Sequence, residues 1–76
     1  MDYHAVSSVR SDMDRLDQAQ ELMAKATALL EDAATATVEG QGASSGAEIY
    51  EAATRVITLS NHAIASAQSA ADLFTE

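Results

Sequence analysis

Apolar residues recur at alternating steps of four and three along the first half of the chain. One such row covers eight positions, six of them apolar: Val9, Met13, Leu16, Gln20, Met23, Thr27, Leu30 and Ala34. This spacing is typical of a heptad seam on one face of a helix. It predicts a helix over about residues 3–38, with Asp2, or alternatively Ser7 or Ser8, as its N-cap.

A second apolar row runs beside the first on the same predicted helix. Its members are Ala19, Leu22, Ala26, Leu29 and Ala33. Together the two rows are wider than one antiparallel neighbour would cover, so we expect the second row to stay available for further helices. The opposite face is expected to lie in water, with Glu21 and Lys25 spaced for an ion pair; it carries Asp14, Asp17, Gln18, Glu21, Lys25 and Asp32.

The second half of the chain repeats the same steps and predicts a helix over about residues 46–75. Its seam consists of Ile49, Ala53, Val56, Ser60, Ala63, Ala67, Ala70 and Phe74, flanked by Tyr50, Ile57, Ile64 and Ala71. Alanines let two helices approach closely, but each one removes little apolar area from water. The edge formed by Ile57 and Ile64 is therefore expected to face other helices.

A turn over residues 39–46 is predicted between the two helices. The only three glycines of the chain, Gly40, Gly42 and Gly46, fall there, and a chain reverses most easily at glycine. Ser45 and Glu48 fit a capping box, in which Ser45 accepts from the Glu48 backbone N–H and the Glu48 carboxylate reaches back to Ser45.

Composition agrees with an all-α fold, because the chain is rich in alanine and other helix formers and contains no proline. We expect one domain, 1–76, forming a helical hairpin. Two helices lying side by side enclose no three-dimensional core. We therefore further expect a four-helix bundle completed by homo- or heterodimerisation. The expected partner interface consists of Val9, Met13, Leu16, Leu22, Met23, Leu29, Leu30, Ile49, Val56, Ile57, Ile64 and Phe74.

Several classes of function are disfavoured. The formal net charge of -8 opposes binding to nucleic acid. No apolar run approaches the roughly 20 residues of a membrane span, and no signal-peptide pattern is present. The chain lacks cysteine, and neither His4 nor His62 has a second ligand at a helical spacing, so no metal or other cofactor is expected. No nucleophile motif or desolvated acid pair indicates an enzyme.

The segment Ala36-Thr-Val38-Glu-Gly40, followed by Gly46-Ala-Glu-Ile-Tyr50-Glu-Ala, resembles the hairpin turn of the small Trp-x-Gly proteins of type VII (ESX) secretion. Gly40 matches the glycine of that motif, Tyr50 resembles the aromatic residue after it, and Val38 occupies the place of the tryptophan. The resemblance implies a small bacterial protein of an antiparallel four-helix bundle. Such a protein is cytoplasmic, or exported without a classical signal peptide as a secreted partner or effector adaptor.

Three functions therefore compete. The first is an Esx-like partner or targeting factor, which predicts a one-to-one complex with another helical protein. The second is a structural homodimer, which predicts a concentration-dependent dimer in isolation. The third is an acidic inhibitor or antitoxin of a basic partner, which predicts binding that weakens steeply with salt.

Overall fold

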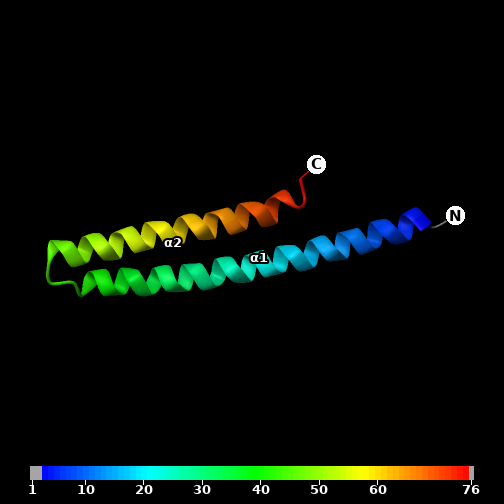
Figure 1. Ribbon diagram of the computed structural model, residues 1–76. Coiled ribbons are helices and arrows are strands. Elements are labelled where there is room, and N and C mark those ends of the chain that lie inside the picture. The colour runs from blue at the N-terminus through cyan, green and yellow to red at the C-terminus, as the bar shows by residue number, and fades with distance from the viewer. Residues whose placement is uncertain (1–2, 76) are drawn as a thin grey trace.

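The chain forms two long helices joined by a short loop. The computed structural model describes the backbone of residues 3–75 and the side chains of residues 12–75. Helix α1 spans Tyr3–Gln41 and helix α2 spans Gly46–Asp72, with no strand among the described residues. The two helices run antiparallel, and α1 continues past the end of α2 toward the N-terminus (Figure 1). The predicted all-α helical hairpin is confirmed.

Glycine has a different role at the turn from the one predicted. Helix α1 continues through Glu39 and Gly40 to Gln41, and none of the three glycines has a positive φ angle. A Cβ atom built on Gly40 would lie 3.3 Å from the Cβ of Ala52. Gly40 thus permits close contact between the helices, and the reversal itself is confined to residues 42–45.

The start of α2 is fixed by hydrogen bonds around Ser45. This residue is extended (φ -146°, ψ 158°), and its Oγ accepts from the backbone N–H of Glu48 at 3.2 Å. That half of the predicted capping box is confirmed. The other half is shifted by one residue, because the Glu48 carboxylate accepts from the backbone N–H of Ser44 at 2.9 Å.

Small side chains form the contact between the two helices. We call this set the inner stripe: all its members are buried or half-buried, and they are Ala19, Leu22, Ala26, Leu29, Ala33 and Ala36 of α1 with Ala52, Val56, Leu59, Ala63, Ser66 and Ala70 of α2. Its α1 half contains the whole second row of the sequence pattern. The expectation that this row would stay free for other helices is therefore wrong.

The row predicted as the α1 seam is the one that is exposed. Met13, Leu16, Met23 and Leu30 all present large apolar side chains to solvent. The physical reason is distance: the close approach at Gly40 and Ala52 leaves room between the helices for methyl groups and a few branched side chains. On α2 the predicted seam is partly right, since its middle from Val56 to Ala70 is covered whereas Ile49, Ala53 and Phe74 are exposed.

The contact with α2 ends where the inner row of α1 becomes charged. Gly40 of α1 lies opposite Ala52 of α2. Because the helices are antiparallel, three steps of seven residues back along α1 correspond to three such steps forward along α2. Ala19 therefore lies opposite Leu73, the residue after α2. One heptad before Ala19 and Leu22 stand Asp12 and Arg15, whose Oδ1 and Nη2 atoms form an ion pair at 2.7 Å. Residues 3–18 of α1 therefore overhang the end of α2 by roughly 24 Å at 1.5 Å per residue.

The hairpin is a thin rod without a three-dimensional core. Its dimensions are 69 × 18 × 10 Å and its radius of gyration is 18.5 Å. A compact domain of this length would have a radius of gyration of about 11 Å. The fold therefore covers only one side of each helix and leaves the remaining sides to solvent or to a partner.

We expect Ala26→Asp to unfold the hairpin and Ala24→Asp to leave it intact. Ala26 is buried in the inner stripe, so the substitution places an unpaired carboxylate between the helices at a cost of more than about 3 kcal/mol. Ala24 is exposed on the same helix and loses equal helix propensity, so its variant isolates the effect of burial. Thermal unfolding followed by circular dichroism at fixed protein concentration distinguishes them; equal melting temperatures would contradict the inner stripe.

Gly40 and Gly46 should respond oppositely to added side chains. A Cβ atom added to Gly46 would meet no other atom within 4 Å, so Gly46→Ala should stabilise the hairpin by about 0.4–1 kcal/mol. Gly40→Leu should destabilise it by about 1–3 kcal/mol, because the side chain must enter the contact with Ala52. Circular dichroism melts of both variants test this; a stable Gly40→Leu protein would mean that the helices are farther apart.

Candidate protein-interaction surface

Most large apolar side chains of the hairpin are exposed. We use the name apolar face for seven of them: Met13, Leu16, Met23 and Leu30 of α1 with Ile49, Ile57 and Ile64 of α2. Each has at least half of its surface accessible to solvent. Scattered exposed leucines are ordinary in proteins, but a continuous row of them on a small rod indicates a contact surface.

The two helices contribute to the same side of the hairpin. Thr37 lies one heptad after Leu30, and it lines an apolar groove together with Ile49, Ala53 and Ile57. Because residues seven apart occupy the same side of a helix in a coiled pair, Leu16, Met23 and Leu30 share that side with Thr37. Ile64 shares it with Ile57 by the same rule. The apolar face is therefore one surface built from both helices.

Two threonines beside the apolar face donate their hydroxyl hydrogen bonds to their own helix. The Thr27 hydroxyl donates to the Met23 carbonyl at 3.1 Å, and the Thr37 hydroxyl donates to the Ala34 carbonyl at 2.6 Å. A hydroxyl bonded to its own helix does not need a water molecule or a partner donor. These threonines can therefore be covered by apolar side chains without leaving an unpaired polar group.

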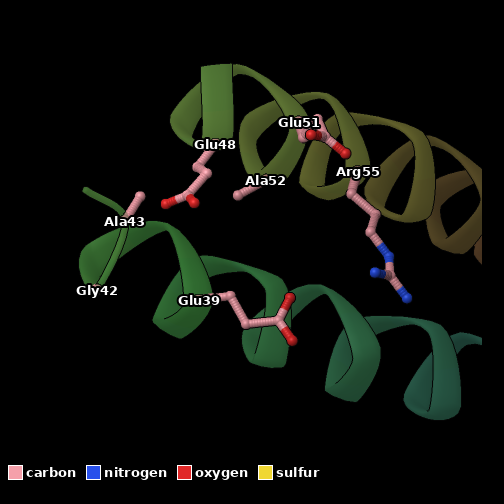
Figure 2. A pocket seen from close by; sticks show the side chains of 7 residues that line it. All are labelled: Glu39, Gly42, Ala43, Glu48, Glu51, Ala52 and Arg55. Atoms are coloured by element: carbon pink, nitrogen blue, oxygen red, sulfur yellow. The ribbon is translucent and has the colours of Figure 1, made fainter. Parts of the chain in front are cut away.

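The charged residues gather on the other side of the hairpin. Figure 2 shows Glu39 of α1 and Glu48, Glu51 and Arg55 of α2 around a pocket beside the turn, with Arg55 extending toward α1. One heptad farther along each helix, Asp32 and His62 continue this side, and Lys25 lines a second pocket with His62. We call it the charged face; all these side chains are exposed and it carries both signs of charge.

The predicted water face of α1 is exposed along its whole length, as expected. The predicted Glu21–Lys25 ion pair does not form, and the ion pair found among the described side chains joins Asp12 and Arg15. No set of three or more His, Asp or Glu side chains among residues 12–75 is grouped as a metal site would require. Neither α1 nor α2, over the described residues, has an apolar segment long enough to cross a bilayer.

The twelve predicted interface residues fall into three groups. Seven form the apolar face, and Phe74 is exposed just after α2. Leu22, Leu29 and Val56 lie half-buried in the inner stripe, so they hold the hairpin together. The side chain of Val9, like that of His4, lies outside the described part of the chain.

Sequence reasoning missed that Ala36, Gly40 and Ala52 belong to the hairpin contact. The signal was present, because the row of small residues from Ala19 through Ala33 continues in steps of seven to Gly40. The four residues of the turn motif lie within the helices: Val38 and Gly40 lie in the last turn of α1, and Gly46 and Tyr50 lie in the first two turns of α2. Val38 and Tyr50 are both exposed.

Comparisons of this chain with protein-family models, with curated proteins and with solved structures found no match.

We expect wild-type protein to assemble through the apolar face, and Leu30→Asp or Ile57→Asp to abolish assembly. Each substitution would bury an unpaired carboxylate in an apolar contact. Glu21→Gln on the exposed charged side should cost at most about 0.5 kcal/mol and leave assembly unchanged. Molar mass by light scattering across a dilution series measures the effect. Assembly of either aspartate variant at wild-type strength would contradict the assignment of this face.

Proposed function

We propose that this chain is a non-enzymatic protein-interaction module whose apolar face binds another helical protein and completes a helical bundle. The observation that carries the proposal is the distribution of side-chain size. The hairpin contact uses alanines, while Leu16, Met23, Leu30 and Ile57 remain at the surface. A chain that needed those side chains for its own hairpin would bury them, since each contributes about 1.5–3 kcal/mol when fully covered.

The resemblance of the turn to the small Trp-x-Gly proteins supports a more specific form of this proposal. In that form the chain is an Esx-like partner or adaptor of a bacterial type VII secretion system, made in the cytoplasm and exported with its partner. The helical hairpin agrees with it, whereas Gly40 lies in the last turn of α1 and not in the loop. Val38 in place of the tryptophan is the point at which this chain departs from the motif.

An acidic inhibitor of a basic protein is supported less well. Such an inhibitor would use the charged face, because the apolar face contains no ionisable side chain. Lys25, Arg55 and His62 interrupt the carboxylates there, so the face does not present a uniform negative surface to a basic partner.

Binding should depend on the apolar face and not on its immediate neighbours. We expect a protein crosslinked to the tagged chain in its native cells to be retained by Thr58→Asp and lost by Ile57→Asp. The two residues are adjacent in α2 and both exposed, but only Ile57 belongs to the apolar face. Mass spectrometry of the crosslinked species identifies the bound chain.

Equal retention by both variants would contradict the proposal that the apolar face is the binding surface. The secretion form of the proposal is judged separately, by whether the chain and its bound protein appear together in the culture medium of intact cells. Their absence from the medium would leave an intracellular interaction module and overturn the exported one.

A further inference from the structure

We infer that the apolar face is covered by a second copy of this chain, packed antiparallel with α1 against α1 and centred on Met23. The inference rests on the proposed function, because it takes the apolar face as the binding surface and names what binds there. Four properties of the described residues carry it: exposed area, charge, the spacing along α1 and the overhang beyond α2.

The area left uncovered matches what a dimer needs. The chain exposes 5820 Å². A compact monomer of 7.9 kDa would expose about 4400 Å², so the hairpin has an excess of about 1400 Å². A standard interface buries about 800 Å² on each partner. One copy on the apolar face is therefore sufficient to remove most of the excess, without a larger partner.

Charge does not oppose pairing through this face. Each chain carries a formal charge of -8, which would separate two copies that met through their charged faces. The apolar face contains no ionisable side chain, and the hydroxyls of Thr27 and Thr37 are bonded to their own helix. In a face-to-face dimer the carboxylates remain on the two outer sides, where water and salt screen them.

The apolar residues of α1 are spaced equally in both directions from Met23. Leu16 lies seven residues before Met23, and Leu30 lies seven residues after it. An antiparallel pair related by a twofold axis at Met23 therefore places Leu16 of each copy opposite Leu30 of the other. The two Met23 side chains meet on the axis. A twofold contact requires this kind of symmetry, in which one patch matches itself.

The overhang gives the pairing its register. Met13 and Leu16 lie beyond the end of α2, so another element must cover them. With the axis at Met23, the overhang of each α1 lies along the half of the other copy that ends in the turn. Leu16 then lies beside Leu30 of the second copy and within two residues of the level of its Ile64.

Other registers leave apolar surface exposed. Centring the dimer near Leu30, at the middle of the segment where α1 and α2 overlap, would leave both overhangs without a neighbour, together with Met13 and Leu16. The Met23 axis instead gives a three-helix cross-section at each end of the dimer, formed by one hairpin and the overhang of the other copy. This arrangement places Met13 and Leu16 of each copy against the hairpin of the other.

Single cysteines test the register, because the chain has none of its own. Met23→Cys and Leu30→Cys form a matched pair: both residues lie in the same row, and they are 51% and 53% exposed. A short bis-maleimide reagent should join two Met23→Cys chains into a covalent dimer. The Leu30→Cys chain should give no such dimer, because two of these cysteines would lie about 21 Å apart along the axis, fourteen residues at 1.5 Å each.

A mixture of Leu16→Cys and Leu30→Cys chains provides a third measurement that does not alter Met23. It should give a crosslinked heteropair, identified by mass spectrometry, because these two positions face each other in the Met23 register. Crosslinking of Leu30→Cys alone, or failure of both the Met23→Cys pair and the mixture in dimeric protein, would overturn the antiparallel register.

Light scattering on the wild-type chain decides whether the partner is a second copy. A dimer supports the inference. A chain that stays monomeric at the highest concentration it reaches in solution overturns it, but leaves the proposed function standing if Ile57→Asp still loses a different crosslinked protein. A monomer for which Ile57→Asp and Thr58→Asp behave alike would overturn both.

Discussion

The close contact between two alanine-lined helices determines the rest of this structure. At Gly40 and Ala52 the backbones come near enough that one additional methyl group would be in tight contact. Side chains larger than alanine fit between the helices only in part, as Leu22, Leu29 and Leu59 do. The larger side chains of α1 are consequently placed outside the contact. The short distance between the helices therefore explains both the hairpin contact and the exposure of the apolar face.

A contact made of methyl groups has a modest energy. Each buried methyl contributes about 0.8 kcal/mol, and the ordering of each residue opposes folding by a comparable or larger amount. The hairpin compensates with local features, among them the Ser45 cap and the uninterrupted helices of a chain without proline. Covering the apolar face adds leucine, methionine and isoleucine burial to this total, so folding and binding of the hairpin are thermodynamically linked.

The helical hairpin, its turn and the Ser45 cap were predictable from the sequence, because they depend on local residue chemistry. Glycines cluster between two heptad patterns, and a serine precedes a glutamate by three residues. The size of the side chains did not predict which row of α1 faces α2. Met13 and Leu30 have more to gain from burial than Ala26 and Ala33, so a rule that places the largest side chains inside selects the wrong row for a lone hairpin.

The same limit applies to the binding surface. A heptad pattern identifies which residues avoid water, but it does not distinguish contact within one chain from contact between chains. Gly40 was the discriminating residue: it stands in step with Ala19, Ala26 and Ala33, and only the row containing it allows the helices to approach closely. Its position near the end of a predicted helix, close to Gly42 and Gly46, instead suggested a turn.

The separation of charge from the apolar face also sets an upper limit on aggregation. In the dimer inferred above, each copy covers the apolar face of the other, so association through that face ends with two copies. The outward surface of the product carries Asp14, Glu21, Glu39 and Glu51 in excess over Lys25 and Arg55, and like-charged products repel one another. In that dimer, repulsion between like charges would oppose further association of a protein that exposes isoleucines and leucines along most of its length.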